Sequence, residues 1–150
     1  MKPLILLAAV FAISAGVSQL STGSGNLIFS GNLAMCLMLC LTAFGHFKFT
    51  QGMGMMMPGF IPFKIQLVYL TGLAEILLGF ALLFPSLRYL AGIILVVLFI
   101  LMLPANIHAA IRHINYETAT YDGKGTGYLW IRIPMQVFFI IWVLYFSVKK

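Results

Sequence analysis

Residues 89–111, YLAGIILVVLFILMLPANIHAAI, form an apolar run without a charged side chain, and this run decides the fold class. At about 1.5 Å per residue, a helix of this length crosses a hydrocarbon core of about 30 Å. Because that core holds no water, backbone N–H and C=O groups must pair within the segment, which favours a helix over an open strand. The run therefore predicts a transmembrane helix and an integral membrane protein.

Four further apolar runs have a similar length, and they cover residues 4–20, 32–49, 65–84 and 127–148. The chain is 62% hydrophobic and 8% charged, whereas a soluble domain is about half apolar and a quarter charged. We therefore predict a single all-α transmembrane domain over residues 1–150, with five helices in contact with the lipid bilayer. Residues 4–20 also resemble a signal peptide; we favour a retained helix because no strong cleavage motif follows them.

The basic residues account for a net charge of +6 and lie mainly at the ends of the apolar runs. That placement is typical of interfacial anchors and topology signals, and it argues against a nucleic-acid surface. With five helices, the N-terminus and the links 50–64 and 112–126 share one side, which carries more Lys and Arg than the other. The positive-inside rule places that side in the cytoplasm. We expect a multi-pass protein of a bacterial inner membrane.

Glu75 stands in the middle of the run 65–84, in YLTGLAEILLGF. An ionised side chain near the centre of a bilayer costs about 2.5–3.5 kcal/mol, so Glu75 either faces the protein interior and finds a partner or stays protonated. Gly72 and Gly79 lie one turn before and after it on the same face and allow another helix to approach closely. Arg132, near the start of the last run, is the expected partner. A structural hydrogen bond and a role in proton transfer or ligand binding both stay open.

Chain direction brings polar residues of four predicted helices into the same half of the membrane. The runs 32–49 and 89–111 end on the side of the link 50–64, whereas the runs 65–84 and 127–148 begin there. The candidates for ligand binding or proton transfer are His46, Glu75, Asn106, His108, Arg132 and Gln136. The alternatives are an Arg132 that only anchors its helix at the interface and interfacial histidines without a ligand.

Pro104 interrupts the hydrogen bonding of the run 89–111, because it has no N–H and leaves the carbonyl of Ile100 free. We expect a kink at this proline. Asn106 follows within one turn, and we expect its side chain to satisfy the backbone groups that the proline frees.

The stretch 45–60, GHFKFTQGMGMMMPGF, is rich in methionine and glycine and links two predicted helices. Thioethers suit Cu(I), so a minor hypothesis is a copper site that combines His46 with Met53, Met55, Met56 and Met57. The favoured interpretation is a bent connection in which methionine fills apolar space. We expect no metal, and the sequence has no haem, flavin or iron–sulfur motif.

Several motifs occur in the order found in a known family. GHF ends a predicted helix, PGFIPF follows, and VYLTGLAEI, LPANIHAAI and WIRIPMQ come after it. With these motifs, residues from about 32 to 146 resemble the DoxX-like membrane proteins. The matching positions are Gly45, His46, Phe47, Pro62, Gly72, Glu75, Pro104, Ala105, Asn106, Arg132 and Pro134, while Gly79 lies beside them. The resemblance implies a four-helix transmembrane bundle, to which residues 1–31 add an N-terminal helix.

The resemblance also implies a link to membrane redox chemistry, with a quinone or a small sulfur compound bound near His46, Glu75 and Arg132. Whether the protein is an enzyme stays open. The first alternative is a non-enzymatic accessory or assembly factor that packs against another membrane protein or a second copy of itself. The second is a small proton-coupled carrier, although the chain lacks the inverted repeats that are common in such proteins.

Overall fold

The computed structural model describes residues 2–23 and 26–149. The regular secondary structure of these residues is helical, apart from one isolated β-bridge between Asn115 and Thr120. The elements are α1 (Lys2–Thr22), α2 (Leu27–Lys48), α3 (Thr50–Met56), α4 (Lys64–Ala81), α5 (Pro85–Ile111), the 3₁₀ turn η1 (Gly125–Tyr128), α6 (Leu129–Val143) and the π-helical turn η2 (Leu144–Val148). Five spans within the described residues are long and apolar enough to cross a membrane. The predicted all-helical, multi-pass architecture is confirmed at this level.

The structure adds one short helix to the prediction and moves several boundaries, with α2 beginning at Leu27 rather than at residue 32. The methionine-rich segment is partly helical, because Thr50–Met56 forms α3 directly after α2 ends. The side of α3 that carries Gly52 and Gly54 packs closely against other parts of the chain, which compensates for the low helix propensity of glycine. In addition, α5 begins at Pro85, earlier than expected, because a proline suits the first turn of a helix.

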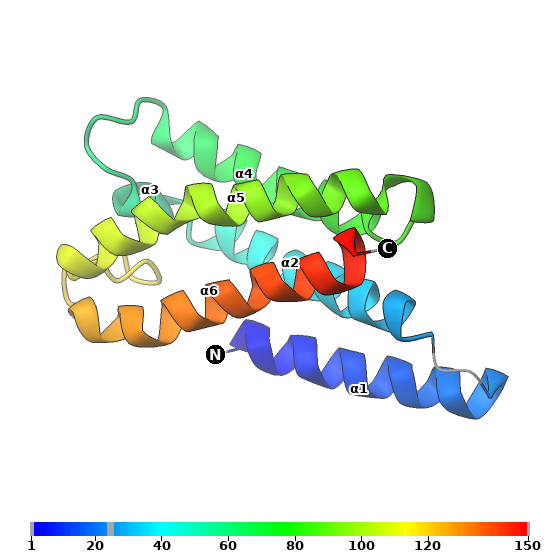
Figure 1. The fold of residues 1–150 in the computed structure, drawn as a ribbon. Helices are drawn as coiled ribbons and strands as arrows, with labels where there is room; N and C mark the ends of the chain where they lie inside the picture. Colours follow the sequence, from blue (N-terminus) through cyan, green and yellow to red (C-terminus); the bar gives the residue numbers. More distant parts are fainter. Residues whose placement is uncertain (1, 24–25, 150) are drawn as a thin grey trace.

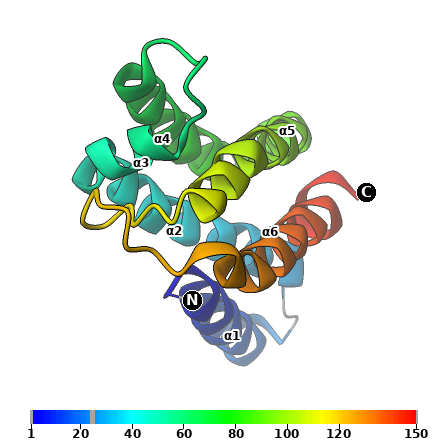
Figure 2. The same ribbon diagram turned by 90° about the vertical axis from the view of Figure 1, so that its left-hand side faces the viewer.

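The long helices run roughly along one axis (Figure 1). Seen end-on, α2 occupies the middle, with α4 and α5 on one side and α6 and α1 on the other (Figure 2). Small buried residues of α2, among them Gly31, Ala34 and Ala43, let the neighbouring helices approach it. The main core lies around α2, where Met35, Met38 and Leu39 pack against residues of α1, α5 and α6.

Helix α1 lies beside α6 and runs in the same direction, but it begins near the middle of α6 (Figure 1). The rings of Phe11 and Trp142 meet edge to face with centroids 5.0 Å apart. The Phe11 ring also lies 5.5 Å from the Phe146 ring, so in two parallel helices Lys2 is level with the turn from Ile133 to Val137. The first turn of α1 therefore lies partway along the bundle, on its outer side (Figure 2), and Leu7 anchors the helix to the core with 1% of its surface exposed.

A polar clamp joins the start of α2 to the end of the chain's last span. The Nδ2 atom of Asn32 donates to the carbonyl of Phe146 at 2.9 Å and to that of Ile28 at 2.8 Å. The Ser147 hydroxyl donates to Oδ1 of Asn32 at 2.6 Å. The Trp142 indole donates to the carbonyl of Gly31 at 3.0 Å. The clamp satisfies the carbonyl group of Phe146, which lies near the end of the last helical segment, where carbonyl groups lack helical partners.

Candidate functional site: a polar cavity between α2, α5 and α6

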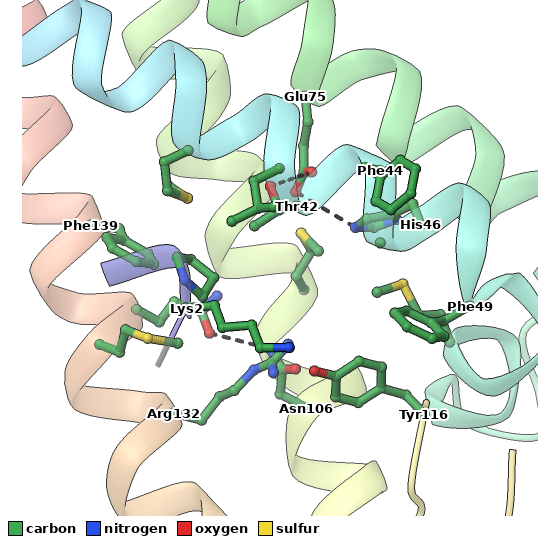
Figure 3. A pocket seen from close by; sticks show the side chains of 18 of the residues that line it. Lys2, Thr42, Phe44, His46, Phe49, Glu75, Asn106, Tyr116, Arg132 and Phe139 are labelled. Atoms are coloured by element: carbon green, nitrogen blue, oxygen red, sulfur yellow. Dashed lines mark hydrogen bonds and ion pairs between the residues drawn. The ribbon is translucent and has the colours of Figure 1, made fainter. Parts of the chain in front are cut away.

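A cavity of about 540 Å³ lies between α2, α5 and α6 in the half of the molecule that contains α3 (Figure 3). Its polar lining consists of Lys2, Thr42, His46, Lys48, Glu75, Asn106, Tyr116, Glu117, Tyr128, Arg132 and Gln136. Its apolar lining includes Met38, Met53, Phe99, Met102, Met135 and Phe139. The cavity is thus amphipathic, and a size of about 300–1,000 Å³ is usual for small-ligand sites.

Glu75 forms its ion pair with His46 across α4 and α2. Its Oε1 lies 3.6 Å from Nε2 of His46, and its Oε2 accepts a hydrogen bond from the Thr42 hydroxyl at 2.8 Å. Only 2% of Glu75 and 5% of His46 is exposed, so both groups depend on protein partners. The carboxylate is held where it reaches the cavity wall.

The hydrogen bonds of His46 indicate which ring nitrogen carries a proton. Its Nδ1 lies 3.2 Å from the carbonyl of Val68, which only accepts, and 3.1 Å from the Thr71 hydroxyl, which can also accept, so an N–H at Nδ1 suits both neighbours. In a neutral ring Nε2 is then an acceptor, and it faces an acceptor oxygen of Glu75. The two groups attract each other only when one more proton is present, either on the carboxyl group or on the ring. The contact between Nε2 of His46 and Oε1 of Glu75 is therefore favourable when the pair carries this additional proton.

Gly72 allows this contact, as expected from its place one turn before Glu75. A Cβ atom at Gly72 would lie 2.8 Å from Cβ of His46, which is closer than real Cβ atoms come. At Gly79 the nearest atom would be Cα of Cys36 at 3.5 Å, an ordinary contact. The close approach of α4 to α2 therefore depends on Gly72 more than on Gly79.

We expect Gly72→Ala to lower the free energy of unfolding by about 2 kcal/mol, because overpacking of this kind typically costs 1–3 kcal/mol. Thermal unfolding of the purified protein in detergent measures the change. Gly79→Ala on the same helix is the matched control and should cost much less. Equal stability of the two variants would show that α4 and α2 do not pack as closely as the structure indicates.

Arg132 is not the partner of Glu75, which corrects the expectation from the sequence. Its Nη1 donates to the Tyr128 hydroxyl, one turn earlier on the same helical segment. Its guanidinium carbon lies 5.4 Å from the centroid of the Tyr128 ring and 5.8 Å from that of Tyr116. Both arrangements are typical of arginine with aromatic rings. His46 takes the place of Arg132 because Gly72 brings α2 next to Glu75.

Asn106 also has a different role from the expected one. Its Nδ2 donates to Oε1 of Gln136 at 3.3 Å, and Nε2 of Gln136 donates to the carbonyl of Phe99. Helix α5 continues through Pro104 to Ile111. The side chain that bonds a backbone carbonyl before this proline is therefore Gln136, and Asn106 orients it. This pair joins α5 to α6 across the cavity.

Tyr116 lies in the link 112–124, outside the membrane-spanning helices, and its hydroxyl points into the cavity (Figure 3). Burial and the neighbouring Tyr128 hydroxyl raise the pKa of Tyr116. The phenol therefore stays protonated at neutral pH and remains available as a hydrogen-bond donor. The residues predicted for the site did not include Tyr116, Tyr128, Thr42 or Lys2. Of these four residues, only Thr42 could have been found from the sequence pattern, since it lies one helical turn before His46 on the same face.

Five of the six candidate residues line the cavity together, namely His46, Glu75, Asn106, Arg132 and Gln136. His108 does not, because its Nδ1 pairs with the carbonyl of Met56 at 2.9 Å. Gly45 also lines the cavity. Pro134 lies within α6, and Pro62 lies in the link between α3 and α4.

The methionines of the segment 45–60 do not gather around His46. Met53 lines the cavity, whereas Met56 is buried against Ala109 and Ile114, with Met55 packed beside it. Methionines of four different elements contribute to the cavity instead, namely Met38, Met53, Met102 and Met135. Flexible thioether side chains of this kind give an adaptable apolar wall. Cys36 and Cys40 are free thiols.

Residues 35–147 match the sequence model of a family described as a domain of unknown function, DUF8561. The chain belongs to this family. The DUF8561 match covers the cavity residues of α2 to α6 and leaves α1, with Lys2, outside. Comparisons with curated proteins and with solved structures find no match.

Proposed function

We propose that this DUF8561 protein is a DoxX-like subunit of a redox system in a bacterial inner membrane, and that it binds a quinone or a similar small ligand in the cavity. The DoxX-like motifs supply His46, Glu75 and Arg132, which all line this one space. A polar end beside a methionine- and phenylalanine-rich wall suits a ligand with a carbonyl-bearing head and an apolar body. The four-helix bundle of the DoxX type, with α1 added, is part of the same proposal.

The His46–Glu75 pair is the observation that carries the proposal. Reduction of a quinone to a quinol consumes two electrons and two protons. A group beside the quinone therefore has to give up a proton to a carbonyl oxygen. In this proposal the His46–Glu75 pair carries one transferable proton at the wall of the cavity, where Nε2 of His46 and Oε1 of Glu75 lie 3.6 Å apart. The electrons come from a partner protein of the membrane, because redox steps of this kind need a cofactor. His46 and Glu75 take the role of proton carrier.

Replacement of Glu75 by glutamine tests this role. The amide can accept from Thr42 and donate to Nε2 of His46, so it keeps both contacts, but it cannot carry the proton. We expect Glu75→Gln to retain the thermal stability of the wild type and to lose quinone-dependent activity and at least about tenfold of the co-purifying quinone. The measurement is mass spectrometry of a lipid extract of the gently purified protein. Asp122→Asn, on the exposed link, is the matched control.

Two results would contradict the quinone proposal. The first is a protein that carries no quinone and arrives with another membrane subunit, which would favour the accessory or assembly role. The second is a quinone content that does not differ between wild type and Glu75→Gln. A loss of stability in Glu75→Ala without any ligand in the wild type would assign the pair to structure alone.

A further inference from the structure

Two cations meet at one end of the cavity without a carboxylate between them. Figure 3 shows the side chains of Lys2, from α1, and Arg132, from α6, directed to the same region, together with Tyr116 and Asn106. We propose that this end of the cavity binds the anionic head group of a bilayer amphiphile, a phosphate or carboxylate oxygen held between Lys2 and Arg132. This end belongs to the same cavity as the His46–Glu75 pair and shares Arg132 with the proposed quinone site, but binding of the amphiphile through Lys2 and Arg132 does not require a quinone.

The charges of the described residues leave Lys2 and Arg132 uncompensated. The ion pair found among them is His46–Glu75. Within the part of the chain that the structure describes, the hydrogen bond of Arg132 goes to the Tyr128 hydroxyl, and its cation–π contacts go to the rings of Tyr116 and Tyr128. Glu117 also lines the cavity, but its Oε1 accepts from the Tyr116 hydroxyl at 3.4 Å and reaches neither cation within ion-pair distance. An anion from outside the chain would complete this arrangement.

The depth of Lys2 in the membrane strengthens the argument for an anion beside it. In the register set by Phe11 with Trp142 and Phe146, Lys2 is level with Ile133 to Val137, which lie about 12–18 Å along the span from Gly125 at about 1.5 Å per residue. An ammonium group at that depth is costly unless it faces water or an opposite charge. The cavity is the space into which Lys2 extends, so an anion bound there would lie next to its ammonium group.

The walls of the cavity favour a lipid over a small anion from water. Leu41 and Phe44 line the cavity and are also exposed on the outer side of α2, by 38% and 61%. The cavity thus opens toward the acyl-chain region there. A molecule with an acidic head and an apolar tail satisfies both the cations and this apolar opening.

Native mass spectrometry of the full chain in detergent, with added dioleoyl phosphatidylglycerol, dioleoyl phosphatidylcholine or inorganic phosphate, tests the proposal. We expect one tightly bound phosphatidylglycerol, preferred over phosphatidylcholine by about tenfold or more, because hydrogen bonds between charged groups are worth that much. Lys2→Gln and Arg132→Gln should each lower this affinity by about tenfold. Lys149→Gln is the matched control, since Lys149 also lies over a tyrosine ring, 5.4 Å from that of Tyr145.

Several results would overturn the proposal. These are equal binding of the two phospholipids, an equal loss of affinity in Lys149→Gln, and binding of inorganic phosphate without binding of phosphatidylglycerol. Lys2 is exposed in the first turn of α1, so Lys2→Gln is expected to fold as the wild type does. A Lys2→Gln protein with unchanged thermal unfolding and unchanged lipid preference would therefore also refute the site. Quinone content measured on the same samples shows separately whether the proposed function holds.

Discussion

Gly52→Ala is expected to lower the free energy of unfolding by about 3 kcal/mol, at the upper end of the usual cost of overpacking. A Cβ atom at this position would stand 2.0 Å from the carbonyl oxygen of Tyr116. The obstacle is backbone, so no side-chain rotation can relieve it. Either α3 or the link that carries Tyr116 has to move. The variant should therefore unfold at a lower temperature and also disturb the cavity.

Thermal unfolding in detergent, followed by circular dichroism, measures this effect. Gly59→Ala is the matched control, because a Cβ atom at Gly59 meets nothing within 4 Å. A shift in lipid or quinone binding in Gly52→Ala, but not in Gly59→Ala, would show that Tyr116 has been displaced. If both variants unfold at the same temperature, α3 does not pack on the link 112–124 as the structure shows.

Asn32→Ala is expected to cost about as much, roughly 3 kcal/mol, because it removes several hydrogen bonds of the clamp at once. The carbonyl of Phe146 and the hydroxyl of Ser147 both lose their partner Asn32. Asn32 is fully buried, so water does not replace these contacts readily. The end of the last span should then detach from the start of α2.

Ser147→Ala and the double variant complete the test of this clamp. Ser147→Ala removes only one hydrogen bond and should cost about 1 kcal/mol. The double variant should cost less than the sum of the two single ones, because the Ser147 hydroxyl needs no partner once it is gone. Thermal unfolding of all three proteins gives the comparison. Strict additivity, or an Asn32→Ala protein as stable as the wild type, would mean that the clamp does not hold η2.

Much of the fold could be predicted from composition and periodicity. Five apolar segments of membrane-spanning length are visible in the sequence because burial in lipid requires a continuous apolar surface and a helical backbone. The short helix α3 could not be predicted, since its glycines oppose a helix and only its packing against Tyr116 and Ile65 offsets their low propensity. In α3, tertiary contacts therefore outweigh the low helix propensity of the local sequence.

The candidate site was predicted in part. Chain direction placed His46, Glu75, Asn106, Arg132 and Gln136 at similar depth, and the structure brings them to one cavity. The pairing within this group was wrong, because depth along the membrane does not tell which helix faces which. Rotation of α4 and the absence of a side chain at Gly72 decide that Glu75 meets His46.

The sequence by itself determined that this protein has five helices of membrane-spanning length and that its polar residues gather in one half of the membrane. These properties depend on single segments, through length, hydropathy and chain direction. Only the tertiary structure decided which polar groups meet, that Lys2 reaches the cavity, and that α1 begins alongside the middle of α6. Such features depend on the rotation and sliding of helices against each other, which side-chain packing sets and no single segment encodes.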